Sequence, residues 1–283
     1  MRPTHLPFLF LVPLLGATLL ASPVDAQRRR GRVDAEIAAL RPKLESGDPA
    51  QMKEGIQGLF ALDNPAVIPV LAELLRSGAP DDVTDEALFV LSELAHRDAM
   101  DVLVEFTNHR RDEARKRAYE AIARIDHPAR RGTLEECLSD SDRDIRGTCA
   151  FALGEIGAKA SLDVLFRAFE RGVVEAAISI GKLGDERHID RFDEYLEQQP
   201  LPIMLDGYNE FLSRNDIKKK RKEKVVTDLG EISGPLVRRF LFDYLNTFSE
   251  NDESELRQAV EETIRRIPDD PSVAGERIPS GGN

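Results

Sequence analysis

The phrase ALGEIG at 152–157 recurs with variation along this chain, as GLFALD at 58–63, VLSELA at 90–95, AIARID at 121–126 and SIGKLG at 179–184. The starts of these five hexapeptides lie 32, 31, 31 and 27 residues apart. A steady period in this range is typical of repeat proteins, in which each unit buries its apolar face against its neighbours. Two more diverged copies follow, DLGEIS at 228–233 and TIRRIP at 263–268. The hexapeptide therefore predicts a repeat architecture.

A second apolar segment follows each hexapeptide after a short break. Its apolar positions recur at spacings of three and four residues, which is one face of an α-helix. The same core position stands 12 residues after the core residue of each hexapeptide, as Leu71, Leu103, Leu134, Leu165 and Phe192. Pro65 stands where such a second helix would begin, a place where a missing N–H costs little. The sequence predicts an all-α protein, an α-solenoid built from helical hairpins.

The regular period fails after Gly184, because the starts of SIGKLG and DLGEIS lie 49 residues apart. This interval contains an expected extra helix at 201–214 and the basic run IKKKRKEK at 217–224. We expect a repeat solenoid over 35–268 with an irregular insertion at about 197–224. Residues 27–34 are expected to form a basic, flexible segment. The tail at 269–283 is rich in Pro, Gly and Ser and is expected to be disordered.

The N-terminus has the pattern of an export signal over residues 1–26. A basic Arg2 precedes an apolar stretch from Leu6 to Leu20, and compact residues end at Ala26, where a signal peptidase would cut. A stretch of 15 residues is about 22 Å long as a helix, which is shorter than the hydrocarbon core of a bilayer. We expect Gln27 to be the first mature residue of a secreted protein, periplasmic or extracellular in the envelope of a bacterium. An uncleaved membrane anchor is the alternative.

The chain has two cysteines, Cys137 and Cys149, which fall at core positions of adjacent expected helices. Two buried thiols that act as small apolar side chains would explain them. The alternative is a disulfide between repeats three and four, which an oxidising compartment would permit. No histidine stands near them at a ligand spacing, so we expect no metal site.

The pattern A-L-G-x-I-G, with an apolar residue and an arginine upstream, resembles the HEAT repeat. The best match is Ile145-Arg146 leading into residues 152–157, and Ala114-Arg115 and Leu256-Arg257 repeat the apolar-Arg pair. The likeness is strongest to the bacterial HEAT-like repeats named after phycobilisome lyases. It implies a right-handed superhelix of hairpins. It also implies that Arg115, Arg146 and Arg257 pair with carboxylates of adjoining units, which is a structural role.

Two groups of HEAT-like proteins are enzymes, and the sequence offers neither chemistry. One group binds a di-iron centre through His-Glu dyads, but none of the five histidines of this chain is followed by Glu. The other group attaches bilin chromophores, a chemistry that the repeat motif itself does not carry and that an exported chain has little access to. Motifs for nucleophilic, nucleotide or zinc chemistry are also absent from the sequence. We expect a protein that is not an enzyme, without cofactor.

The face formed by the second helices is the expected binding surface, because second helices commonly line the concave side of a solenoid. Fourteen residues after each core position stand Glu73, Glu105, Glu136, Arg167, Glu194 and Asp243. Five of these six residues are acidic, which predicts an acidic groove for a basic segment of a protein partner. Charge placed there only for solubility is the alternative. The net charge of −12 argues against a nucleic-acid partner.

The function that these patterns favour is a protein-protein interaction scaffold of the cell envelope. The alternative is a structural or assembly factor that touches membrane or a polymer through the basic run at 217–224. A solvated helix face would also explain that run. The sequence gives no basis for an oligomeric state.

Overall fold

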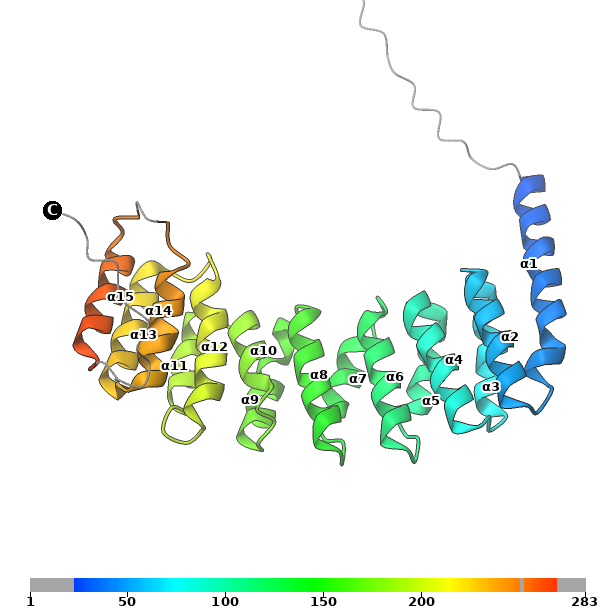
Figure 1. The fold of residues 1–283 in the computed structure, drawn as a ribbon, viewed down its shortest axis with the longest axis horizontal. Coiled ribbons are helices and arrows are strands. Elements are labelled where there is room, and N and C mark those ends of the chain that lie inside the picture. The colour runs from blue at the N-terminus through cyan, green and yellow to red at the C-terminus, as the bar shows by residue number, and fades with distance from the viewer. Residues whose placement is uncertain (1–22, 250–251, 269–283) are drawn as a thin grey trace, which may run out of the picture. The chain divides into compact units, whose positions relative to one another are not determined.

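The computed structural model describes residues 23–249 and 252–268 of the 283-residue chain (Figure 1). These residues form fifteen α-helices and three short 3-10 turns, and no strand is found among them. The prediction of an all-α protein is confirmed. The chain divides into two compact units, residues 1–67 and residues 68–283. The tail predicted at 269–283 and most of the predicted export signal lie outside the described residues.

The first unit contains α1 (Pro23–Leu44), α2 (Pro49–Ala61) and a 3-10 turn, η1 (Pro65–Val67). Helix α2 begins after Asp48, whose side chain accepts a hydrogen bond from the Ala50 backbone N–H at 3.0 Å. Helices α1 and α2 pack closely because α2 has glycines at the contact. A Cβ atom at Gly58 would lie only 2.6 Å from Leu40 Cδ2. Their shared core holds Ile37, Leu44, Met52, Ile56 and Leu59.

The prediction of a flexible segment at 27–34 is wrong, because these residues belong to α1. Arginine and glutamine are good helix formers, and the segment contains four arginines and one glutamine. An ion pair one turn apart, between Arg32 and Glu36 at 2.9 Å, adds a small stabilisation. The basic composition therefore favoured a helix with a polar surface over a disordered segment.

The second unit continues the hairpins that the hexapeptide predicts. Its regular part contains α3 (Ile68–Arg76), α4 (Asp81–Leu94), α5 (Met100–Phe106), α6 (Asp112–Arg124), α7 (Arg130–Cys137), α8 (Arg143–Glu155), α9 (Leu162–Glu170), α10 (Ala176–Leu183) and α11 (Glu186–Asp193). Two 3-10 turns, η2 (Arg97–Ala99) and η3 (Lys159–Ser161), open the segments that lead into α5 and α9. Helices α12 (Leu201–Ser213), α13 (Lys219–Ile232), α14 (Pro235–Leu245) and α15 (Glu255–Arg266) complete the unit.

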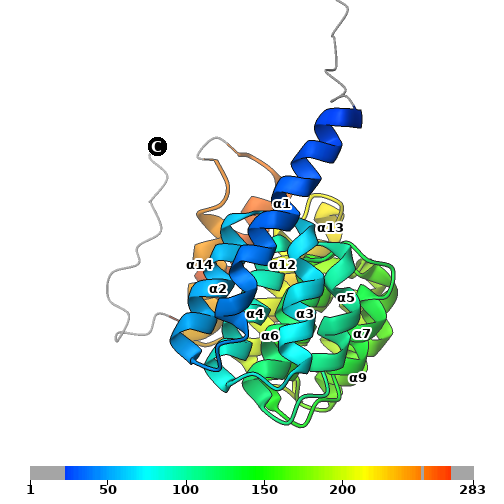
Figure 2. The same cartoon turned by 90° about the vertical axis from the view of Figure 1, so that its right-hand side faces the viewer.

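The helices of the second unit form two layers. Helices α4, α6, α8, α10 and α12 pack on one another in this order, and we call them the first-helix layer. Helices α3, α5, α7, α9 and α11 form the second-helix layer; Figure 2 shows α3, α5, α7 and α9 on the other side of the stack from α4, α6 and α12. This arrangement is the α-solenoid that the sequence predicts.

The core lies between the layers, where the repeat alignment places it. The core residues of the hexapeptides in this unit are fully buried, as Leu91, Ile122, Leu153 and Ile180. The residues 12 positions later are fully buried as well, as Leu103, Leu134, Leu165 and Phe192. Each such side chain contributes about 1.5–3 kcal/mol by its removal from water. The register read from the hexapeptide is therefore correct through α11.

The last two hexapeptide copies, DLGEIS and TIRRIP, do not lie in the first-helix layer, where the earlier copies of this unit lie. The additional helix α12 stacks on α10 in the first-helix layer, so α13 falls into the second-helix layer. There Arg221 of α13 bonds Asp190 of α11 at 2.8 Å, and α15 packs beside α13. Helix α14 lies beside α12 (Figure 2). The Tyr244 hydroxyl of α14 donates to the Leu212 carbonyl oxygen of α12 at 3.4 Å. The likeness of DLGEIS to the earlier hexapeptides would put it at the end of a first helix, but α13 lies in the second-helix layer because of the one extra helix, α12.

Candidate functional site

A groove of about 570 Å³ crosses helices α4, α6 and α8 on the outer side of the first-helix layer. Phe89 of α4 and Phe151 of α8 form its walls, with 43% and 45% of their surfaces exposed. Ala123 of α6 lies between them. The two phenylalanines occupy one repeat position, two residues before the core residue, and α6 has Glu120 there. The groove therefore follows from two large apolar residues on alternate units.

Charged pairs between neighbouring helices border this groove. Arg124 of α6 pairs with Glu93 of α4, and Lys182 of α10 pairs with Glu155 of α8. The Lys182 Nζ also lies 4.9 Å from the centre of the Phe151 ring, a cation–π contact. Glu120 is exposed at the middle of the groove, and none of the described residues forms an ion pair with it. Ion pairs between neighbouring helices thus form the rim of the groove, and the exposed carboxylate of Glu120 lies at its middle.

A second groove, of about 250 Å³, lies on the same layer between α10, α12 and α14. Its apolar part comes from Ile178, Leu205, Phe240 and Tyr244, and its rim carries Asp206, Glu210 and Asp243. Burial raises the pKa of Tyr244 to about 12, so its hydroxyl keeps its proton at neutral pH. None of the described residues that line this groove is Lys or Arg. The second groove is therefore apolar at its base and acidic at its rim.

The acidic column predicted for the second helices is only partly brought together. Glu73, Glu105, Glu136 and Arg167 are exposed on α3, α5, α7 and α9, and Glu194 is exposed at the end of α11. Asp243 lies on α14, beside the first-helix layer, so its predicted place on the second helices is wrong. The exchange of layers after α12 is the reason.

Glu105, in the middle of that column, is bound within the protein. Arg76 of α3 donates to its two carboxylate oxygens at 2.6 and 2.8 Å. The hydrogen bond from Arg76 lowers the pKa of Glu105. Arg167 adds a positive charge further along the column. Two of the five residues that remain on this face therefore do not add to an acidic field.

Most basic side chains of the run at 217–224 bind other residues of the same chain. Lys218 bonds Glu186, Arg221 bonds Asp190 and Asp193, and Lys224 bonds Asp228. Lys222 is buried, and its Nζ donates to the Leu212 carbonyl oxygen at 2.6 Å. Four of the six basic side chains in the run thus have partners within the chain, which leaves little free charge for a membrane or a polymer.

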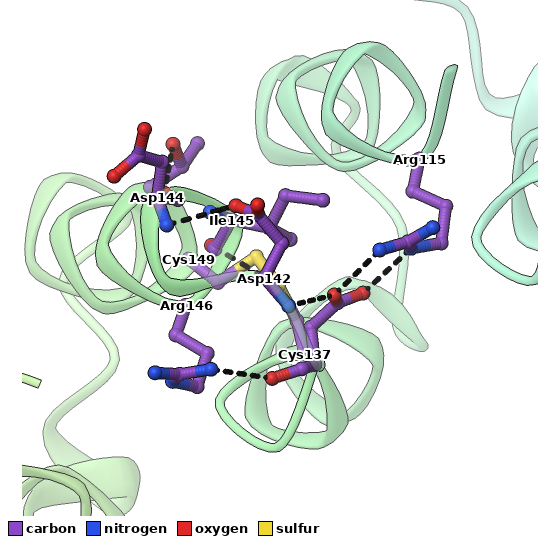
Figure 3. Close-up of a disulfide and its surroundings, with 9 residues drawn as sticks. Arg115, Cys137, Asp142, Asp144, Ile145, Arg146 and Cys149 are labelled. Atoms are coloured by element: carbon purple, nitrogen blue, oxygen red, sulfur yellow. Dashed lines mark hydrogen bonds and ion pairs between the residues drawn. A yellow bond between two sulfur atoms is a disulfide. The ribbon is translucent and has the colours of Figure 1, made fainter. Parts of the chain in front are cut away.

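The structure joins Cys137 and Cys149 by a disulfide (Figure 3). Cys137 ends α7 and Cys149 lies in α8, both fully buried, with their Cα atoms 6.1 Å apart. Of the two alternatives that the sequence leaves open, the structure therefore has the bonded one. The bond links the second helix of repeat three to the first helix of repeat four.

The three arginines of the apolar-Arg pairs differ in their partners. Arg115 forms two hydrogen bonds to the Asp140 carboxylate of the next unit, as the resemblance implies. Arg146 donates to the backbone carbonyl oxygens of Asp140 and Ser141. Thirty-one residues after Asp140 the chain has Arg171, so the equivalent carboxylate is missing for Arg146.

The third arginine, Arg257, also bonds backbone carbonyls. It donates to the oxygens of Ser249 and Asp252 and lies 3.2 Å from the Glu261 carboxylate of its own helix. Arg115 likewise donates to the backbone oxygens of His109 and Arg110, so each of the three arginines bonds the loop before its own helix.

Residues 23–249 and 252–268 contain neither a cluster of metal ligands nor a membrane-spanning helix. In that part of the chain no group of three or more His, Cys, Asp or Glu could hold a metal ion. None of the helices there is long and apolar enough to cross a membrane.

Known proteins provide two further findings. A family model described as HEAT repeats matches residues 75–148 and 100–176, which run from the end of α3 to the start of α10. The likeness to HEAT repeats is confirmed, and the narrower likeness to the phycobilisome-lyase type stays a prediction. No curated protein matches the chain.

Several solved structures resemble the chain at low identity. An engineered protein is 19% identical, with 84% of this chain and 71% of the other covered at a TM-score of 0.47. Human deoxyhypusine hydroxylase in complex with glycerol is 17% identical, with 86% and 98% covered at a TM-score of 0.37. A second engineered protein is 19% identical, with 81% and 94% covered at a TM-score of 0.37.

Proposed function

Because HEAT repeats run through residues 75–176, we propose that this chain is a non-catalytic protein-interaction scaffold. HEAT repeats are commonly used for protein-protein interaction, and solenoids offer long surfaces for it. The partner binds in the groove of α4, α6 and α8. The observation that carries this assignment is the pair of exposed phenylalanines, Phe89 and Phe151, at one repeat position.

The energetics of the groove favour binding. Contiguous exposed apolar surface on a protein in water commonly marks a contact with another molecule. Covering the exposed part of each phenylalanine would contribute about 1 kcal/mol. The pairs Arg124–Glu93 and Lys182–Glu155 already fix neighbouring helices, so little side-chain order is lost on binding. A preformed groove of this kind suits a segment of a partner protein.

This proposal moves the partner from the second helices to the first-helix layer. On the second-helix face Arg76 binds Glu105, and the column also contains the basic Arg167. Both facts weaken the acidic groove expected there. Among the described residues, α3, α7, α9 and α11 expose no large apolar side chain, and α5 exposes only Val104. Substitutions in the first groove should therefore reduce binding of the partner, whereas substitutions on the second-helix face should not.

The proposed location is the bacterial cell envelope, after export. The apolar stretch from Leu6 to Leu20 supports it, and so does the buried disulfide, since such bonds are rare in reducing compartments. N-terminal sequencing of protein isolated from its own cells provides the test. A first residue at Gln27 and a bonded cysteine pair are expected, and an N-terminal Met1 with free thiols would contradict export.

The binding proposal is tested with the protein in its own cells. Crosslinking followed by mass spectrometry identifies the partner, and the purified full chain is then used to capture it. Phe89→Ser with Phe151→Ser should reduce capture at least tenfold, and circular dichroism checks that the fold is kept. Glu73→Lys with Glu136→Lys, on the second helices, is the matched control. Loss of capture in this control alone would place the partner on the other face and overturn the proposal.

A further inference from the structure

We infer that the docking segment of the partner is apolar in one part and basic in another, and that its basic part lies in the second groove. This inference rests on the proposed function, because it describes the occupant of the same face. The docking surface is here the two grooves together, on α4, α6, α8, α10, α12 and α14.

The two grooves are parts of one continuous surface. The repeat position of Phe89 and Phe151 is occupied in the next unit by Ile178, which lines the second groove. Helices α8 and α10 pack directly, and the buried Ser179 hydroxyl donates to the Ala150 carbonyl oxygen at 2.7 Å. A chain that leaves the first groove across Phe151 therefore reaches Ile178 on the neighbouring helix.

The charges of the second groove select the occupant. Asp206 and Glu210 are four residues apart on α12 and so share one face, and Asp243 of α14 stands on the opposite side of the groove. Arg239 lies 4.0 Å from Asp243, but both side chains are largely exposed, so the pair is weak. Three carboxylates without a lining cation attract a basic side chain and repel an acidic one.

The apolar base of the same groove suits the apolar stem of a lysine or arginine side chain. Such side chains carry a long apolar stem below their charge, and arginine also stacks on aromatic rings. Phe240 and Tyr244 offer those rings beside the rim. A basic side chain can therefore bury its stem against the aromatic residues while its cation meets the carboxylates. This fit favours a basic segment over a purely apolar one.

The spacing of the helices sets the length of the segment. Packed helices lie roughly 10 Å apart, so about 20 Å separate α8 from α12. An extended chain covers about 3.3 Å per residue, which places the basic residues about six positions from the residue that contacts Phe151. The partner segment is thus expected to combine an apolar cluster and a Lys/Arg cluster at that separation.

A displayed library of random 16-residue peptides, selected against the full chain, tests this inference. The selected peptides should carry an apolar cluster and a basic cluster about six residues apart. Their affinity is then measured for Asp206→Asn/Glu210→Gln/Asp243→Asn, which should bind about tenfold more weakly, with a flatter dependence on salt. Glu73→Gln/Glu136→Gln/Glu194→Gln changes the net charge equally on the other layer and should bind as the unaltered chain does.

Each result bears on one claim. Unchanged affinity in the first triple variant, equal weakening in both triple variants, or a selection without basic peptides would overturn the inference. The proposed function has a separate readout in Phe89→Ser/Phe151→Ser, which should bind none of the selected peptides. Full binding by that variant would overturn the proposed function, whatever the triple variants do.

Discussion

Arg115 and Asp140 form a doubly hydrogen-bonded ion pair between consecutive units, with Nε and Nη2 each 2.9 Å from a different carboxylate oxygen. Only 13% of the Arg115 side chain and 7% of the Asp140 side chain are exposed. The Asp142 backbone N–H also donates to Asp140 at 2.8 Å, so the same carboxylate holds the loop that begins α8. This pair therefore couples the orientation of α6 to the start of the next hairpin.

Asp140→Ala should lower the free energy of unfolding by roughly 1.5–3 kcal/mol, because it removes two charge-assisted hydrogen bonds from the half-buried Arg115 cation. Urea denaturation followed by circular dichroism measures this change. Asp163→Ala is the matched control, since Asp163 pairs with Arg191 but has 78% of its side chain exposed. The control should change stability by less than about 1 kcal/mol. Equal effects in the two variants would contradict a coupling role for Arg115.

The same carboxylate predicts how stability depends on pH. Burial raises the pKa of Asp140, but the hydrogen bonds from Arg115 and from the Asp142 N–H outweigh it and hold the pKa below its ordinary 3.8. The unfolded chain then binds more protons than the folded one in acid. The contribution of Asp140 is complete above pH 3.8 and is lost as pH falls through its folded pKa.

Urea titrations between pH 6 and pH 2 measure this dependence. Asp140→Asn removes the titrating group, so its unfolding free energy should fall less steeply with acid than that of the unaltered chain. Parallel curves for the two proteins would show that Asp140 does not contribute to acid sensitivity.

Reduction of the Cys137–Cys149 disulfide should lower the free energy of unfolding by about 3 kcal/mol, because the bond closes a short loop of the unfolded chain. The two cysteines are 12 residues apart. Urea denaturation with and without a phosphine reductant gives the difference. Cys137→Ala with Cys149→Ala is the control and should respond equally in both conditions. An unaltered chain that does not respond to the reductant would show that the bond adds no stability.

The sequence was sufficient to predict the core, because burial follows the repeat. Leu91, Ile122 and Leu153 stand at the same position of successive hexapeptides, and all are fully buried. The first groove also has a signal in the sequence, at a position outside the core. Phe89 and Phe151 are large and apolar at a position outside the core, where a soluble helix normally has polar residues. Reading the exposed columns for apolar residues would have found it.

The layer of α13, and with it the place of Asp243, could not be predicted from the repeat alone. The extra helix α12 is expected from the sequence, but its layer depends on its packing against α10. That packing rests on a close approach of two backbones, at Gly181 and Gly207. Such an approach depends on the residues of both helices, whereas the repeat describes one unit at a time. Alignment of the repeats by position therefore could not predict the second groove.

Leu153→Ala tests the register of the core. Leu153 is fully buried between the layers, so the substitution should cost on the order of 2–5 kcal/mol through lost burial and the cavity left behind. Phe151→Ser, two residues away, removes a side chain that is 45% exposed and should cost clearly less. Denaturation midpoints compare the two variants directly. A cost below about 1 kcal/mol for Leu153→Ala would show that the register is wrong.

Gly181→Ala tests the approach of α10 to α12. A Cβ atom at this position would lie 2.3 Å from the Gly207 carbonyl oxygen and 2.7 Å from Glu210 Cβ, so the two helices would have to separate. The helix propensity of alanine gains up to about 1 kcal/mol over glycine, but the strain of such overpacking costs typically about 1–3 kcal/mol. We expect a net loss of stability in thermal or urea denaturation. Gly132→Ala in α7 is the matched control, because a Cβ atom there meets nothing within 4 Å and the variant should gain stability. Equal gains in both variants would mean that α12 does not pack against α10 at this distance.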